Sequence, residues 1–126
     1  MDFKQDKAIY MQLVDRLCDE ILSGKYQADD RIPSVREFAV LLAVNTNTVV
    51  KAYDQLSLSG IIYTRRGLGN FVSPQAREHI LSTRRQRFMN ESLPEVFRQM
   101  QLLGISISQV DALWSQHLAA APADDE

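Results

Sequence analysis

The chain has 126 residues, of which 45% are hydrophobic and 24% are charged, and its formal net charge is −2. These values are typical of a globular protein with one or two small domains. No apolar run approaches the ~20 residues of a membrane span, and the first residues contain no apolar signal region, so we expect neither membrane insertion nor secretion. The single cysteine, Cys18, excludes an internal disulfide and offers no metal cluster, so we expect a cytoplasmic setting, no metal and no cofactor.

The net charge conceals a strong asymmetry along the chain. Residues 1–30 carry four Lys and Arg against seven Asp and Glu, and residues 88–126 carry one against six. Residues 31–87 carry nine against three, a net charge of +6. A basic centre between acidic ends is typical of a surface that binds phosphate groups. A solvated helix face is the alternative explanation for Arg77, Arg84, Arg85 and Arg87. It explains Arg36, Arg65 and Arg66 less well, because these residues sit at a helix start and a glycine turn.

The first predicted helix spans residues 8–23. Its apolar residues recur at intervals of three and four, which places them on one helix face. They are Tyr10, Leu13, Val14, Leu17, Cys18 and Ile21. We therefore expect Cys18 to be a core residue and not a reactive thiol. Gly24 is a natural helix end, and residues 25–30 are predicted to form a polar loop.

Two short helices joined by a tight turn are predicted next. Ser34 followed three residues later by Glu37 is a capping box, which indicates that a helix starts after Pro33. Asn45 is a favourable N-cap for the following helix. The buried side of that helix is predicted to consist of Val49, Ala52, Tyr53 and Leu56. Two helices joined by a turn of three or four residues form a helix-turn-helix, a motif whose second helix can enter the major groove of DNA.

A basic hairpin is predicted directly after these helices. The β-prone stretches 61–64 and 70–72 flank residues 65–69, Arg-Arg-Gly-Leu-Gly, which have the composition of a hairpin turn. A helix-turn-helix followed by such a hairpin is a winged helix. In that arrangement the helix contacts base edges while the arginines of the hairpin reach the DNA backbone or the neighbouring minor groove.

The remainder of the chain is predicted to be helical. Residues 75–103 are helix-prone, but Pro94 should kink or break this helix near residues 90–93. Gly104 should end it, and a second capping box, formed by Ser106 and Gln109, should open a last helix through about residue 118. Residues 121–126 are expected to form a disordered acidic tail.

Several motifs, in this order along the chain, resemble the DNA-binding domain of the GntR family of bacterial regulators. They are Tyr10-Met11-Gln12, Pro-Ser-x-Arg-Glu-x-Ala at residues 33–39, Asn-x-Asn-Thr-Val at 45–49, Lys51-Ala52-Tyr53, and Arg-Gly-x-Gly-x-Phe-Val at 66–72. The 54 residues after Val72 are too few for the larger effector-binding or pyridoxal-phosphate enzyme-like domains of other members. The short helical tail is similar to that of the YtrA subfamily. Two residues depart from the pattern: Thr46 stands where that subfamily usually has proline, and Val50 where other branches often carry a basic residue.

The resemblance implies a mainly α fold with a small β-hairpin. Residues 1–73 would form the winged helix-turn-helix, and residues 74–120 would form a short two-helix dimerisation tail. The implied function is that of a sequence-specific transcriptional regulator, a repressor, which binds a pseudo-palindromic operator in double-stranded DNA as a homodimer. The resemblance assigns no small-molecule effector.

Two alternatives to this function remain at the level of sequence. A winged helix can serve protein–protein contact or assembly, with incidental DNA binding. An enzyme is not expected, because His79 and His117 have no ligand neighbours at metal spacing and no Gly-rich phosphate loop follows a strand.

The predicted DNA contacts fall in three places, and the predicted dimer contacts fall in the tail. Ser34 and Arg36 lie at the start of the first helix of the motif, where the arginine fork suits guanine or phosphate, although Arg36 could instead form a surface ion pair with Glu37 or another carboxylate. The second helix contributes Thr46, Asn47, Thr48 and Lys51, although polar residues are also common at helix starts because they hydrogen-bond to the helix backbone there. The wing contributes Arg65, Arg66 and Gly67. The predicted dimerisation residues are Phe88, Val96, Met100, Leu103, Val110, Leu113 and Trp114, of which Trp114 and Met100 could instead line a small-molecule pocket with Phe97.

Overall fold

The computed structural model describes residues 8–121 of the chain, and none of the helices in that range is long and apolar enough to cross a membrane. The chain divides into two compact units between Arg84 and Arg85, and each unit is described by itself. The expected acidic tail lies, from residue 122 onward, outside the described residues.

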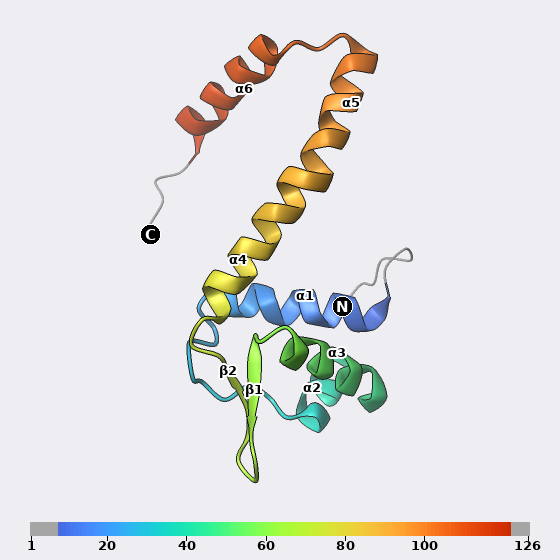
Figure 1. Ribbon diagram of the computed structural model, residues 1–126, viewed down its shortest axis with the longest axis vertical. Helices are drawn as coiled ribbons and strands as arrows, with labels where there is room; N and C mark the ends of the chain where they lie inside the picture. Colours follow the sequence, from blue (N-terminus) through green and yellow to red (C-terminus); the bar gives the residue numbers. More distant parts are fainter. Residues whose placement is uncertain (1–7, 122–126) are drawn as a thin grey trace. The chain divides into compact units, whose positions relative to one another are not determined.

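The chain is mainly helical with one small antiparallel hairpin, which confirms the predicted fold class (Figure 1). Unit 1 contains α1 (Ile9–Leu22), α2 (Val35–Leu42), α3 (Thr46–Leu58), β1 (Ile62–Arg65), β2 (Gly69–Val72) and most of α4 (Ala76–Arg87). Unit 2 contains the end of α4, a π-helical turn η1 (Phe88–Ser92), α5 (Leu93–Leu103) and α6 (Ile107–Ala120).

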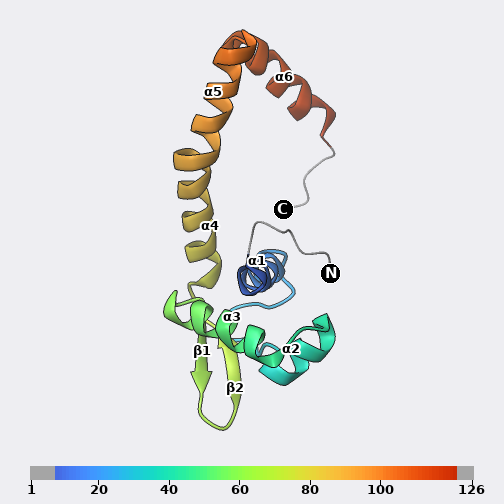
Figure 2. The ribbon, with the colours of Figure 1, turned by 90° about the vertical axis from the view of Figure 1, so that its right-hand side faces the viewer.

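Unit 1 has a hydrophobic core in which α1 packs against α3. Figure 2 looks nearly along α1, with α2 and α3 on one side of it and the hairpin extending beyond them. The predicted apolar face of α1 is confirmed, because Leu13 and Leu17 are fully buried and Cys18 lies beside them in the core. All four residues predicted for the buried side of α3 are buried as well: Val49, Ala52, Tyr53 and Leu56. The core therefore fixes which side of α3 remains available to a partner.

Each strand of the hairpin extends one residue further toward the turn than the sequence predicts, to Arg65 in β1 and to Gly69 in β2, whereas β1 begins one residue later, at Ile62. Ile62 pairs with Val72 at the base of the hairpin, and both side chains are buried in the core. The other edge of β2 is also paired. The Asp29 N–H donates to the Val72 carbonyl (2.8 Å), and the Ile32 N–H donates to the Asn70 carbonyl (2.9 Å). Residues 29–32 thus pair with β2 on the edge opposite β1, although residues 29 and 30 were predicted to belong to a loop.

The first turns of α4 belong to the core of unit 1. Ala76 and Ile80 are buried, and the Arg84 guanidinium forms an ion pair of 2.7 Å with the Asp19 carboxylate of α1. These contacts extend the compact unit to Arg84, and the predicted division into functional domains after residue 73 stays a prediction.

Pro94 is accommodated by a widened helical turn. A proline inside a helix lacks an N–H donor, and its ring clashes with the carbonyl four residues earlier. Here η1 precedes it, and the Leu93 N–H donates to the Phe88 carbonyl, five residues back. The kink or break expected near residues 90–93 therefore takes the form of a π-helical turn, which relieves the crowding while the helical hydrogen bonding continues.

The last helix begins as the sequence predicts. Gly104 adopts a left-handed conformation with φ of 68° and ends α5. Ser106 then caps α6: its Oγ accepts from the Gln109 N–H (3.2 Å), while its own N–H donates to the Gln109 side chain (2.8 Å). The second capping box is thereby confirmed.

Candidate nucleic-acid interface

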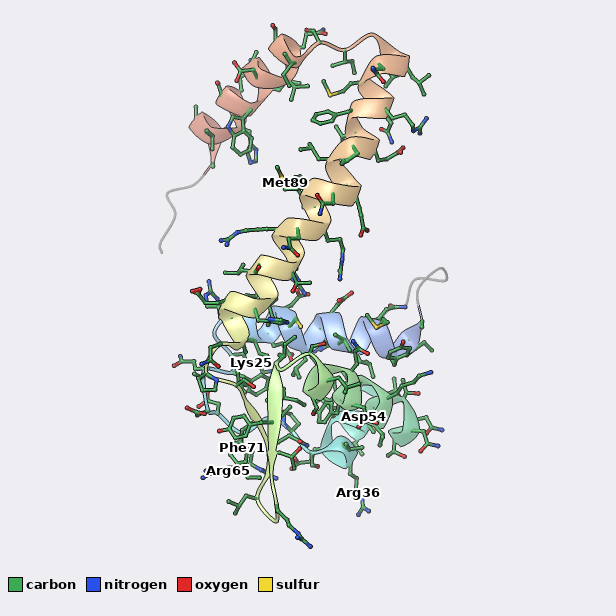
Figure 3. The ribbon with its side chains drawn as sticks, in the orientation of Figure 1. Lys25, Arg36, Asp54, Arg65, Phe71 and Met89 are labelled. Atoms are coloured by element: carbon green, nitrogen blue, oxygen red, sulfur yellow. The ribbon has the colours of Figure 1, made fainter. Side chains whose placement is uncertain are left out.

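The start of α2 presents Arg36 to solvent. The Glu37 N–H donates to Ser34 Oγ (3.1 Å), and the Glu37 carboxylate accepts from the Ser34 N–H (2.8 Å), which is the predicted capping box. These bonds from Ser34 lower the pKa of Glu37. Because Glu37 is occupied in this way, the alternative of an Arg36–Glu37 pair is not realised, and Arg36 forms no ion pair within residues 8–121. Figure 3 shows Arg36 projecting from α2 on the side away from α1.

The first turn of α3 leaves polar groups exposed. Asn45 caps the helix, since its Oδ1 accepts from the Asn47 N–H (2.8 Å). Thr46 and Asn47 are exposed, whereas Thr48 is half-buried. The outward edge of this turn therefore offers hydroxyl and amide groups of the kind that read base edges in a major groove.

Further along α3 the exposed face carries apolar and acidic residues as well as a basic one. Val50 is exposed and apolar, and the Lys51 ammonium lies 4.6 Å from the centre of the Tyr10 ring of α1, within cation–π distance. Asp54 is exposed one turn beyond Val50 (Figure 3). A carboxylate repels phosphates, so the basic character of this surface comes from α2 and the hairpin and not from the whole of α3.

The two wing arginines have different surroundings. Arg65 lies in β1, where its guanidinium carbon is 5.8 Å from the centre of the Phe71 ring (Figure 3). Phe71 in turn stacks on Tyr63 at 5.7 Å between ring centroids. Arg66 lies in the turn, where Gly67 adopts a φ of 77° that favours glycine. Arg66 is thus the arginine at the tip, and Arg65 lies along the side of the hairpin.

A hydrogen bond links α3 to the start of α2. The Tyr53 hydroxyl donates to the Pro33 carbonyl at 2.6 Å, and burial raises the pKa of Tyr53. Tyr53 also packs on Phe38, with ring centroids 5.8 Å apart. Sequence reasoning assigned Tyr53 to the core only. Its hydroxyl, which sets the position of α2 against α3, was missed because helical periodicity says nothing about the polar end of a tyrosine.

The structure therefore brings the predicted DNA contacts onto one unit in three groups. Ser34 and Arg36 open α2, Thr46 and Asn47 open α3, and Arg66 with Gly67 forms the hairpin turn. No group of three or more His, Cys, Asp or Glu within residues 8–121 could hold a metal ion. What these groups can do is donate hydrogen bonds and positive charge to an extended anionic partner.

Comparison with known proteins identifies the family. The family model described as "Bacterial regulatory proteins, gntR family" matches residues 9–72, slightly over half of the chain. The chain belongs to the GntR family. The match covers α1 through β2, which is the winged helix itself.

Two HTH-type relatives match over most of their length. The chain is 33% identical to the transcriptional regulator YhcF of Bacillus subtilis over 104 residues, which are 82% of this chain and 84% of that protein. It is 29% identical to the transcriptional repressor YtrA of the same organism over 120 residues, or 95% and 91% of the two chains. The similarity therefore includes the tail, as the resemblance to the YtrA subfamily implies. The GntR family consists of transcriptional regulators and not enzymes, and this chain is a DNA-binding regulator of that kind.

Solved structures of GntR proteins agree with this assignment. A GntR-family regulator from Bacteroides thetaiotaomicron has 43% sequence identity and a TM-score of 0.79, covering 89% of this chain and 97% of that one. The DNA-binding domain of AraR, solved in complex with operator ORR3, has 27% identity and a TM-score of 0.53, covering 58% of this chain and 88% of that one.

The predicted dimerisation residues of this GntR protein all lie in unit 2, and that unit has no buried residue in η1, α5 or α6. Met100 and Val110 are half-buried, whereas the other predicted residues are exposed: Phe88, Val96, Leu103, Leu113 and Trp114. The same elements expose further apolar residues that the sequence analysis did not assign to the dimer contact: Met89, Phe97, Leu102, Ile107 and Leu118. Their number indicates that the apolar surface of unit 2 is broader than one helical stripe.

Proposed function

We propose that this protein binds a specific operator in double-stranded DNA and represses transcription from it. The observation that carries the proposal is that one unit carries Arg36, which forms no ion pair within residues 8–121, the exposed polar first turn of α3, and the wing arginine Arg66. An arginine fork and a short polar helix start are the groups that contact phosphates and base edges in helix-turn-helix proteins. The AraR complex with its operator supports this reading, because that domain shares the fold. We place this activity in the cytoplasm, where bacterial DNA lies.

We further propose that the protein acts as a homodimer through unit 2. Leu103 is 70% exposed and Trp114 is 57% exposed, and η1, α5 and α6 contain no buried residue, so unit 2 leaves far more large apolar side chains in water than a monomeric protein usually does. A second copy of unit 2 would cover these side chains with the same kind of residues, which is the arrangement of a two-fold interface. Two winged helices in one dimer would then bind two half-sites related by two-fold symmetry.

The alternative function, protein contact through the winged helix, has one observation in its favour. Val40 and Leu41 of α2 are 78% and 60% exposed, which gives unit 1 an apolar spot outside its core. A protein-binding module would use this spot, and its DNA binding would be weak and indifferent to sequence.

Selection of bound duplexes from a random DNA library by the full-length protein tests the proposal. We expect enrichment of one sequence with two inverted half-sites whose centres lie about one helical turn apart. Arg36→Ala, carried through the same selection, should enrich weakly or not at all. Failure of the wild-type protein to enrich any sequence would overturn the proposal and favour the protein-binding alternative.

A further inference from the structure

Arg31 lies outside the predicted contacts, yet its backbone runs beside the wing. It forms an antiparallel bridge with Phe71 of β2. The residues on either side of it are hydrogen-bonded to β2, through the Val72 N–H to the Asp30 carbonyl (2.9 Å) and the Ile32 N–H to Asn70. Arg31 is therefore fixed at the outer edge of the hairpin and is not on a free loop.

The side chain of Arg31 extends along the hairpin to its turn. Its Nε donates to the carbonyl of Leu68 at 3.2 Å, and Leu68 lies between the two turn glycines. Gly69 leaves the space for this contact. A Cβ on Gly69 would lie 2.9 Å from Arg31 Nε. Gly69 also has a φ of +123°, which residues other than glycine rarely adopt. The glycine at this position thus permits the arginine to pack directly on the wing.

The terminal amino groups of Arg31 form no ion pair or hydrogen bond within residues 8–121. The residue is exposed and uses only its Nε in the bond to Leu68. The guanidinium therefore lies beside the wing turn, on the segment that leads into α2 four residues later.

We propose that Arg31 contacts a DNA phosphate with its terminal amino groups while its Nε positions the wing turn. Arginine can do both, because its five N–H donors form a planar fork, so one edge can bind the carbonyl while the other faces an anion. This inference rests on the proposed function. It adds a phosphate-contacting cation beside the wing turn and makes the placement of Arg66 depend on Arg31.

The salt dependence of DNA affinity separates the phosphate contact from a purely structural role. Each phosphate neutralised steepens the decline of log affinity with log salt concentration by about 0.9. Arg31→Gln removes the charge but keeps an amide donor for the Leu68 carbonyl, so we expect its slope to be shallower than wild type by about one per subunit. Arg31→Lys should keep the slope. Arg31→Ala should lose both roles and bind more weakly than Arg31→Gln at physiological salt, by a similar factor on every sequence, because a phosphate contact carries no base discrimination.

Arg16→Gln is the matched control, because it makes the same change on α1, where Arg16 pairs with Glu20 at 3.5 Å. All variants are measured on the duplex that the wild-type protein selects, after circular dichroism has shown that each is folded. An unchanged slope in Arg31→Gln would overturn the phosphate contact, whatever its affinity. If the slope is unchanged in Arg31→Gln but the wild-type protein binds tightly and with salt dependence, the proposed function stands and only the Arg31 contact is wrong. A wild-type protein that binds no duplex would contradict both the Arg31 contact and the proposed function.

Discussion

At the scale of single residues, the arginines of the basic segment fall into two kinds. Arg84 pairs with Asp19, and Arg77 donates to the Leu22 carbonyl, so both hold α4 against α1. Arg36 and Arg66 have no carboxylate partner within residues 8–121. The sequence placed Arg77 and Arg84 on a helix and Arg36 and Arg66 at a helix start and a glycine turn. It could not show the partners of the first pair, because the carboxylate and the carbonyl that bind them come from another helix.

We predict that Arg36→Ala and Arg66→Ala will each weaken binding to the selected duplex by roughly 1–3 kcal/mol, because each removes a fork that can bind guanine or phosphate. Fluorescence anisotropy titration with labelled duplex measures the change. Arg98→Ala is the control, since Arg98 lies in unit 2 and pairs with Glu95 at 2.6 Å. Folded Arg36 and Arg66 variants that bind as tightly as wild type would remove these residues from the interface.

At the scale of elements, the two capping boxes, α3 and the hairpin were predictable to within a few residues. Each depends on local chemistry: Ser34 with Glu37, Ser106 with Gln109, and the glycines of the turn. Three features were not predictable. Residues 29–32 lack the alternating apolar pattern of a strand, although they pair with β2. Ala43 ends α2 in a left-handed conformation that favours glycine, and the π-helical turn before Pro94 has no simple sequence signal.

The relation between α2 and α3 depends on the buried end of Tyr53. We predict that Tyr53→Phe will lower the free energy of unfolding by about 1 kcal/mol, because it removes the bond to the Pro33 carbonyl in a part-buried site. Thermal or chemical denaturation measures this loss. Tyr63→Phe should cost less, since its bond to Asp29 is exposed. Equal stability of Tyr53→Phe and wild type would show that this hydrogen bond does not hold α2 in place.

At the scale of the whole molecule, the two units differ in how their apolar residues are used. Unit 1 buries Leu17, Phe38 and Val49 completely, as a self-sufficient domain does. Unit 2 leaves its large apolar residues in water. The sequence predicted apolar points in the tail, but helical spacing could not show whether they form an internal core or meet a partner, because both patterns have the same period.

We predict that Leu113→Glu or Trp114→Glu will convert the dimer to a monomer, because each places a charge in the apolar contact. Sedimentation velocity at micromolar concentration measures the change, and the DNA affinity should fall with it because a monomer contacts only one half-site. Gln116→Glu adds the same charge on α6 at an exposed polar position and should leave the dimer intact. A monomeric wild-type protein, or dimers that persist in both variants, would move the interface away from this surface.

The salt dependence of wild-type DNA binding tests the central claim most directly. If the dimer neutralises about six phosphates, its affinity for the selected duplex should fall roughly a thousandfold between 50 and 200 mM salt, with log affinity linear in log salt concentration. That result would show that the basic surface of unit 1 replaces counterions on a DNA backbone. An affinity that is flat over the same range would contradict the account and identify the winged helix as a surface for another kind of partner.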